Sequence, residues 1–260
     1  MTVSLDRLAA VALDVAKEAG ALALDGWRGR LQIHKKGRTD LVTHLDLASE
    51  KLIKQRLAER TPDIPVVGEE SGGEVVSGLQ WYADPIDGTT NFAHGHPIWS
   101  VSVGLLDDGR PVAGAVGAPV LGMEWTAYDG GPALRNGAPI HVSTERDVTE
   151  AYLGTGFPYA GRDLEPDNNF ASFARVKKVV QAVRRIGSAA LDCCFVAEGI
   201  YDGYWERSVN AWDVAAALAV VLAAGGKVTH LDGSPPDLQR GNLLVTNGLI
   251  HEPLGKLVVG

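Results

Sequence analysis

Residues 79–92 read Leu79-Gln80-Trp81-Tyr82-Ala83-Asp84-Pro85-Ile86-Asp87-Gly88-Thr89-Thr90-Asn91-Phe92. The apolar beginning, residues 79–83, predicts a buried strand that ends directly before Asp84. Pro85 fixes its own φ and favours an extended Asp84, while Gly88 permits a turn that a side chain would obstruct. The pattern therefore predicts a strand that delivers two carboxylates, Asp84 and Asp87, into one turn.

This turn has two possible roles. Carboxylates three residues apart suit a hard cation such as Mg²⁺, which prefers oxygen ligands. The amides of Gly88 and Thr89 would also point at a phosphate if a helix begins there. An isolated Asp-x-x-Asp-Gly, however, is more often an Asp-Pro turn followed by a capped helix. Whether other acidic segments lie close to this turn distinguishes the two roles.

Three further acidic segments are candidates for the same site. Glu69-Glu70 follows a short predicted strand and a glycine, although such a pair is usually solvated surface. Asp213 precedes an apolar helix, where it would cap the helix, and Asp46 fits a capping box with Thr43. If these side chains converge on Asp84, their repulsion forces some of them to protonate unless cations offset the charge.

The rest of the chain predicts alternating helices and strands. Apolar periodicity predicts helices at residues 5–24, 43–60, 188–198 and 214–224 and near the C-terminus. Strands are expected at 64–67, 79–83, 99–105, 111–116, 123–128, 201–205, 227–231 and 243–246, and Asn136-Gly137 predicts a hairpin. Residues 154–169 read as a long surface loop. We therefore expect a layered α/β fold as one compact unit, with an antiparallel-leaning α+β half (residues 1–150) packed on an α/β half (151–260).

Composition narrows the class of protein. A chain of 260 residues with 45% hydrophobic and 22% charged residues is typical of globular proteins. The net charge of -8 argues against a nucleic-acid partner, because phosphate backbones are bound by clustered Lys and Arg. Neither a membrane span nor a signal peptide is predicted, so we expect a cytoplasmic protein. Cys193 and Cys194 are adjacent, which disfavours a disulfide or a zinc site and predicts buried apolar residues.

Three segments resemble the signature motifs of the inositol monophosphatase family: Gly68-Glu69-Glu70-Ser71, residues 84–92 as quoted above, and Trp212-Asp213-Val214-Ala215-Ala216. Further similarity at Thr39-Asp40-Leu41-Val42-Thr43 and Arg185-Ile186-Gly187-Ser188-Ala189-Ala190 extends the resemblance over nearly the whole chain. The nine-residue central motif is highly specific. The resemblance implies an α-β-α-β-α sugar-phosphatase fold and a homodimeric, lithium-sensitive phosphatase that depends on Mg²⁺.

The resemblance also implies a ligand set for the metal, about two or three Mg²⁺ ions per subunit. Glu69, Asp84 and the carbonyl of Ile86 would bind the first ion. Asp84, Asp87 and Asp213 would bind the second. The ions would activate a water for direct attack on phosphorus, and no covalent nucleophile is required.

Catalytic and substrate contacts are implied in the same way. Glu69 and Thr89 would position the attacking water, and Asp46 would accept a hydrogen bond from the Thr89 hydroxyl. The implied substrate contacts are the backbone amides of Gly88 and Thr89 for phosphate, and Ala189 and Glu206 for the polyol.

The substrate is less closely defined than the chemistry. Thr90-Asn91 resembles the inositol phosphatase branch, which favours hydrolysis of myo-inositol 1-phosphate to inositol and phosphate. Fructose 1,6-bisphosphatase and histidinol-phosphate phosphatase activities stay open, because related proteins share the motif. Paired carboxylates without a metal would instead suit a glycoside hydrolase. A third alternative is a non-catalytic interaction protein on a phosphatase scaffold.

Overall fold

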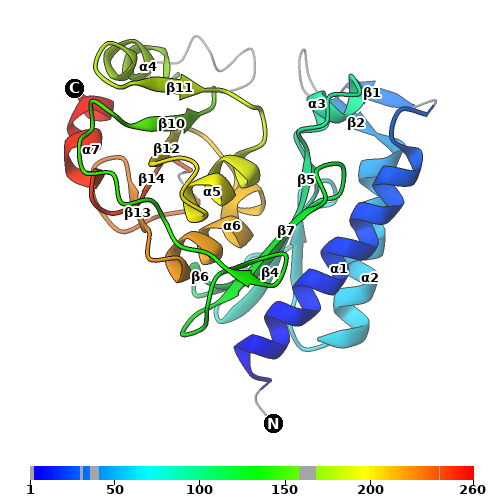
Figure 1. The fold of residues 1–260 in the computed structure, drawn as a ribbon. Helices are drawn as coiled ribbons and strands as arrows, with labels where there is room; N and C mark the ends of the chain where they lie inside the picture. Colours follow the sequence, from blue (N-terminus) through cyan, green and yellow to red (C-terminus); the bar gives the residue numbers. More distant parts are fainter. Residues whose placement is uncertain (1–2, 30–31, 36–40, 158–167, 240) are drawn as a thin grey trace.

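The computed structural model describes residues 3–29, 32–35, 41–157, 168–239 and 241–260 (Figure 1). The helices are α1 (Leu5–Gly26), α2 (His44–Arg60), α3 (Thr89–Ala93), α4 (Phe170–Lys177), α5 (Ala189–Ala197), α6 (Ala211–Ala223) and α7 (His251–Val259). The strands are β1 (Ile33–Lys35), β2 (Leu41–Thr43), β3 (Val66–Gly68), β4 (Leu79–Asp87), β5 (Ser100–Asp107), β6 (Arg110–Ala118), β7 (Met123–Tyr128), β8 (Leu134–Arg135), β9 (Ala138–Pro139), β10 (Tyr152–Thr155), β11 (Ala182–Arg184), β12 (Gly203–Glu206), β13 (Lys227–His230) and β14 (Leu243–Thr246).

Five layers build the molecule (Figure 1). Helices α1 and α2 cover one face of a seven-stranded sheet of order β3-β4-β5-β6-β7-β8-β9, which is antiparallel except for the β3–β4 pair. Helices α5 and α6 lie between this sheet and a mixed five-stranded sheet of order β11-β10-β12-β14-β13. Helices α4 and α7 pack together on the outside of the smaller sheet. This is the α-β-α-β-α fold that the resemblance implies.

The large sheet and α6 touch almost backbone to backbone. Gly104 on β5 and Gly114 on β6 are opposite each other in the sheet. A Cβ on Gly104 would lie 2.4 Å from the backbone nitrogen of Ala216, and one on Gly114 would lie 2.6 Å from its Cα. Glycine at both positions therefore brings α6, and Asp213 at its beginning, close to the middle of the large sheet.

Strand β4 is longer than residues 79–83, the predicted strand, because it continues through the acidic motif to Asp87. Its pairing with β5 shifts register between Asp84 and Asp87. Pro85 lies inside the shift, where its missing N–H removes nothing from the regular pairing. The prediction that the strand ends before Asp84 was therefore wrong, because a bulge can keep a proline within a strand.

Other boundaries also differ from the predictions. Helix α6 begins at Ala211 rather than at residue 214, with Asn210 as its N-cap. Residues 154 and 155, predicted as the beginning of a loop, belong to β10, while residues 158–167 lie outside the described residues. The sequence did not predict β1, β2, β11 or α4. The Asn136-Gly137 hairpin is confirmed, since both residues have positive φ (49° and 78°) between β8 and β9.

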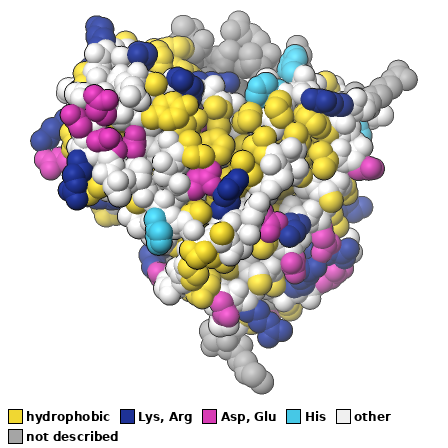
Figure 2. Space-filling view, viewed as in Figure 1, with side chains coloured by type: hydrophobic (Ala, Val, Ile, Leu, Met, Phe, Trp, Pro, Cys, Tyr) yellow, Lys and Arg dark blue, Asp and Glu magenta, His cyan; other side chains and the backbone are white. Residues whose placement is uncertain are grey.

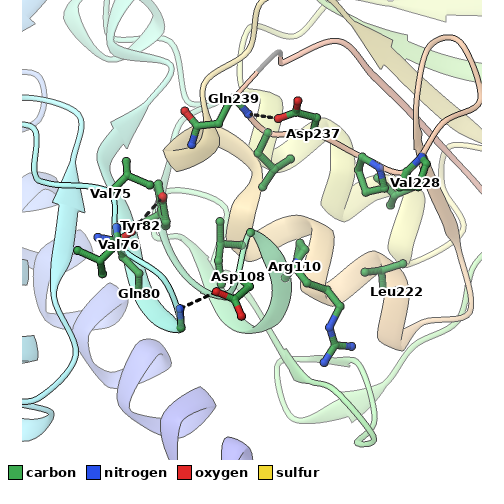
Figure 3. Close-up of a pocket in the computed structure, with 17 residues that line it drawn as sticks. Val75, Val76, Gln80, Tyr82, Asp108, Arg110, Leu222, Val228, Asp237 and Gln239 are labelled. Carbon is green, nitrogen blue, oxygen red and sulfur yellow. Dashed lines mark hydrogen bonds between the residues drawn. The ribbon is translucent and has the colours of Figure 1, made fainter.

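A groove of 710 Å³ lies at the end of β4 away from the acidic motif (Figure 3). Its lining is largely apolar, and its polar groups are occupied: Asp108 accepts a hydrogen bond from the Gly78 N–H at 2.7 Å, and Arg110 pairs with Asp129 at 2.7 Å. None of the predicted site residues lines this groove. Across the described residues, no helix combines the length and apolar character needed to cross a bilayer.

Candidate active site

Asp84 and Asp87 lie on either side of the register shift in β4. Asp84 is 2% exposed, and its Oδ1 accepts a hydrogen bond from the Ile86 N–H at 2.9 Å. In a regular strand, residues three positions apart point to opposite faces. The shift removes this constraint, and the negative charge of Asp87 contributes to a raised pKa of Asp84. The two carboxylates therefore share one buried region.

The N-terminus of α5 binds the Asp87 carboxylate. Oδ1 accepts a hydrogen bond from the Ala189 N–H at 3.2 Å, and Oδ2 accepts one from the Ala190 N–H at 2.9 Å. The hydroxyls of Ser188 and Ser100 also donate to Oδ2. A helix N-terminus stabilises negative charge, so Asp87 joins the two halves of the chain at this point.

Gly88 and Thr89 form the turn after β4. Gly88 has φ 92°, and a Cβ there would lie 3.0 Å from the carbonyl oxygen of Gly187. The Thr89 hydroxyl lies 3.2 Å from Asp46 Oδ1 and 3.0 Å from the Ile86 carbonyl oxygen, so its single proton has two acceptors. Asp46 Oδ2 accepts from the N–H of Thr43 at 2.8 Å, which completes the predicted capping box.

Glu69 and Asp213 reach the same site from two other elements. The Glu69 N–H donates to the carbonyl oxygen of Ala83 at 3.1 Å, directly before Asp84. Ser102 pairs with Asp84 in the sheet, and its hydroxyl donates to the carbonyl oxygen of Trp212 at 3.1 Å. This bond places the beginning of α6 beside Asp84. The Asp213 carboxylate also accepts from the Asn210 N–H at 2.8 Å.

These four carboxylates repel one another. Burial raises the pKa of Asp84 well above its ordinary value, and the charges of Glu69, Asp87 and Asp213 raise it further. Burial, followed by the charges of Glu69 and Asp87, also raises the pKa of Asp213. Burial raises the pKa of Asp87 to about 6 against its hydrogen bonds to Ser188 and the α5 amides. Protons or cations must therefore neutralise part of this charge.

Hard divalent cations fit this site by donor type and charge. Carboxylate oxygens are the ligands that Mg²⁺ prefers, and their mutual repulsion is relieved by a cation. No three of the described Asp, Glu, His or Cys side chains already surround a single point as a finished ligand set. Asp87 and Asp213 hold helix N-termini in this arrangement.

Glu206 lies across the site on β12. Burial raises its pKa to about 7, while its hydrogen bond from the Tyr204 hydroxyl and the charge of Arg185 oppose the shift. Gly156 leaves the space that the Glu206 carboxyl fills, since a Cβ at Gly156 would lie 1.9 Å from Oε2. Glu206 is close enough to Asp213 for its charge to raise the pKa of that residue. A carboxyl group therefore faces the acidic cluster from the second half of the chain.

The sequence model of the inositol monophosphatase family matches residues 4–259. This chain belongs to the inositol monophosphatase family.

Relatives within the family carry different names. An inositol-1-monophosphatase from Synechocystis sp. is 43% identical over 95% of this chain and 86% of its own length. A protein from Pasteurella multocida named Nus factor SuhB is 38% identical over 95% of this chain and 94% of its own length. The structure of an inositol monophosphatase from Anabaena (Nostoc) sp. has a TM-score of 0.90 and 37% identity, covering 99% of this chain and 97% of that one.

In this inositol monophosphatase-family chain, the signature motifs meet at the end of β4. Sequence reasoning missed Ser188, Ala190 and Ser100, which all contact Asp87. The sequence does contain a signal for Ser188 and Ala190. Gly187-Ser188 before an apolar helix predicts an N-cap, and the backbone N–H groups in the first turn of such a helix attract an anion. No sequence signal points to Ser100, since its contact with Asp87 depends on the strand register alone.

Proposed function

We propose that this protein is a metal-dependent phosphoric monoester hydrolase acting on a small polyol phosphate, with myo-inositol 1-phosphate as the preferred substrate. The observation that carries the proposal is the convergence of Glu69, Asp84, Asp87 and Asp213, from three distant segments, on one site, in which Asp84 and Asp87 are buried. The names of the inositol-1-monophosphatase relatives support the substrate.

Magnesium is the proposed cofactor. Glu69, Asp84 and the Ile86 carbonyl would hold one ion, and Asp84, Asp87 and Asp213 a second. Bound ions would offset the carboxylate charge, hold phosphate oxygens and lower the pKa of a water.

Thr89 and Asp46 would orient the attacking water together with Glu69. In the proposed arrangement the Thr89 hydroxyl donates to Asp46 Oδ1 rather than to the Ile86 carbonyl oxygen, and its own oxygen accepts a hydrogen bond from water. Burial raises the pKa of Asp46, and a higher pKa makes this carboxylate a better proton acceptor. The buried position of both side chains keeps the pair in one geometry.

Phosphate and polyol would be held on opposite sides of the cluster. The amides of Gly88 and Thr89, at the beginning of α3, would donate to the phosphate oxygens. Glu206 would accept hydrogen bonds from ring hydroxyls, and the Ala189 backbone would contact the same ring. Fructose 1,6-bisphosphate and histidinol phosphate would be weaker substrates, because they present hydroxyls or amines in a different arrangement.

A phosphate-release assay tests the proposal. The panel contains myo-inositol 1-phosphate, fructose 1,6-bisphosphate, histidinol phosphate and a nucleotide bisphosphate, each with Mg²⁺ or with EDTA. We expect the highest kcat/KM for the inositol ester, loss of activity in EDTA and recovery with added Mg²⁺. A chromogenic glycoside tests the metal-free alternative, because a glycosidase would keep its activity in EDTA.

A chain that releases no phosphate from any ester would refute the proposal and favour a binding role. A preference for the nucleotide bisphosphate would refute only the substrate assignment.

We further propose a homodimer in the cytoplasm. Hydrophobic side chains gather around the middle of the face seen in Figure 2, near α5 and β5, as a subunit interface requires. Light scattering on the purified protein measures the oligomeric state, and cell fractionation measures the location.

A further inference from the structure

Helix α2 carries a second buried carboxylate, Glu50, one turn after Asp46. Glu50 is 3% exposed, and Asp46 is fully buried. Residues four positions apart lie on the same face of a helix, about 6 Å apart along its axis. Asp46 contacts Thr89, and Glu50 lies on the same side of the helix, toward the site.

Both carboxylate oxygens of Glu50 bind the segment that contains Glu69. Oε2 accepts a hydrogen bond from the Glu70 N–H at 2.6 Å. Oε1 accepts one from the Ser71 N–H at 2.9 Å, and the Ser71 hydroxyl donates to the same oxygen. A carboxylate that accepts hydrogen bonds from two consecutive backbone N–H groups fixes the orientation of both peptide planes.

Two further contacts close the turn around Glu50. The Gly72 N–H donates to the Gly68 carbonyl oxygen at 3.0 Å, and the Gly68 N–H donates to the Gly72 carbonyl oxygen at 3.1 Å. Gly68 leaves room for the carboxylate, because a Cβ there would lie 2.5 Å from Glu50 Cδ. Lys54, one turn further along α2, donates to the Gly72 carbonyl oxygen at 2.8 Å and lies 3.6 Å from Glu50 Oε1.

The backbone of Glu69 is therefore held on both sides. Its own N–H donates to Ala83, the residue before Asp84, at 3.1 Å. The next two amides donate to Glu50. We infer that Glu50 is a positioning residue, which sets the Glu69 carboxylate against Asp84 and the attacking water. This inference rests on the proposed function, since Glu50 itself touches neither substrate nor metal.

Helix α2 then acts as a single rigid support for the Thr89 hydroxyl and for the turn that carries Glu69. Asp46 fixes the Thr89 hydroxyl, and Glu50 fixes the turn that carries Glu69. The helix itself fixes the spacing between the two carboxylates, so the spacing between Thr89 and Glu69 does not depend on the loops alone.

The test is Glu50→Gln, which keeps the side-chain shape but turns one acceptor into an NH₂ group facing a backbone N–H. The loss of a group that orients a metal ligand costs about 10–100-fold in metal affinity or activity. We expect calorimetric titration with Mg²⁺ to show at least about 10-fold weaker binding to the variant. Amide hydrogen exchange at Glu70 and Ser71 should accelerate, and kcat should fall while KM at saturating Mg²⁺ stays within about threefold.

The matched control is Glu59→Gln on the exposed part of the same helix, where the Glu59 carboxylate bonds to Gln55 and Arg56. It should leave Mg²⁺ binding, exchange and turnover unchanged. If Glu50→Gln does not fold, Glu50→Asp keeps the charge but shortens the side chain, so that it cannot reach both amides. The same weakening of Mg²⁺ binding is expected for that variant.

A purely structural role for Glu50 predicts a different result. The melting temperature would fall, while the Mg²⁺ dissociation constant, measured well below the melting temperature, would equal that of the wild type. That outcome, in either variant, overturns the inference. An inactive wild type that binds Mg²⁺ would instead refute the proposed function, because the calorimetric and exchange measurements need no substrate.

Discussion

Asp46 divides its two carboxylate oxygens between two tasks. Oδ2 accepts hydrogen bonds from the backbone and hydroxyl of Thr43 at 2.8 and 2.5 Å, which caps α2. Oδ1 accepts from the Thr89 hydroxyl at 3.2 Å. From the sequence, capping was the better interpretation of Asp46, and it is confirmed. The capping role and the proposed proton relay are compatible, because each uses a different oxygen.

The first prediction concerns this hydroxyl. Thr89→Ala removes the hydroxyl that would accept a hydrogen bond from the attacking water, but it leaves the backbone amides that would hold phosphate. We expect kcat to fall about 100-fold, the low end for loss of acid–base assistance, with KM within about threefold. Thr90→Ala, at the exposed neighbouring position, is the matched control and should be fully active. A Thr89 variant that changes only KM would contradict the proposed role.

A second prediction uses the space that Gly156 leaves. Gly156→Ala would place a methyl group 1.9 Å from Glu206 Oε2, so the carboxyl must rotate away. Because a hydrogen bond to a charged group is worth about 1.5–3 kcal/mol, we expect KM for myo-inositol 1-phosphate to rise about 10-fold or more. The KM for p-nitrophenyl phosphate, which has no ring hydroxyls, should stay within about threefold.

Gly117→Ala is the control for this experiment, since its added Cβ would meet no atom closer than 3.7 Å. An equal rise in KM for both esters would show that the Gly156 variant disturbs the phosphate site rather than the polyol contact.

At the scale of the element, α7 is anchored by a buried histidine. His251 is 7% exposed and lies between the hydroxyls of Thr229 on β13 and Thr246 on β14, at 2.9 and 2.8 Å. Burial, with a smaller contribution from the charge of Lys227, lowers its pKa to about 4. The folded protein therefore keeps this ring neutral at pH values where the unfolded chain binds a proton.

This difference predicts the sign of a pH effect. Because the folded pKa lies below the ordinary value of about 6.5, the unfolded state takes up the proton as the pH falls. The contribution of His251 to the free energy of unfolding should drop by about 2 kcal/mol between pH 7 and pH 5. Urea unfolding of wild type and His251→Gln at both pH values measures it. The variant should lose less stability on acidification, and parallel losses would contradict the assignment.

How far each element could be predicted depends on how local its cause is. The helices α1 and α2 were predicted because their apolar residues repeat along the helix itself. The end of β4 was misplaced, because Pro85 reads as a strand terminator and only the pairing with β5 allows the bulge. β1, β2 and β11, each three residues long, give too short a pattern to recognise.

The site shows the same division. The residues that converge were predicted through a resemblance, since no local pattern brings Asp213 to Asp84. Their convergence depends on Gly104 and Gly114, whose role is visible only when α6 lies against the sheet. Glu50 was not predicted, because an acidic residue within a helix usually faces solvent.

At the scale of the whole molecule, the acidic site joins the two halves of the chain. Glu69, Asp84 and Asp87 belong to residues 1–150, while Asp213 lies in the first turn of α6, a helix from residues 151–260 that packs on the large sheet. Repulsion among these carboxylates opposes their association. A cation bound between them reverses the sign of that interaction, so metal binding should stabilise the packing of the halves against each other.

Mg²⁺ should therefore raise the melting temperature of the wild type and EDTA should reverse the rise. At about 100 times the dissociation constant, a ligand adds about 2.7 kcal/mol, which corresponds to about 5–10 °C for a chain of this size. Asp213→Asn keeps an acceptor for the Asn210 N–H, 2.8 Å away, so the helix cap survives while a charge that repels Glu69 and Asp87 is lost. The melting temperature of this variant without metal should equal or exceed that of the wild type, but its gain with Mg²⁺ should be smaller and require more Mg²⁺. Asp14→Asn on the exposed surface should behave as the wild type. If Asp213→Asn and the wild type gain equally at the same Mg²⁺ concentration, Asp213 is not a metal ligand and the two halves are not joined through the ion.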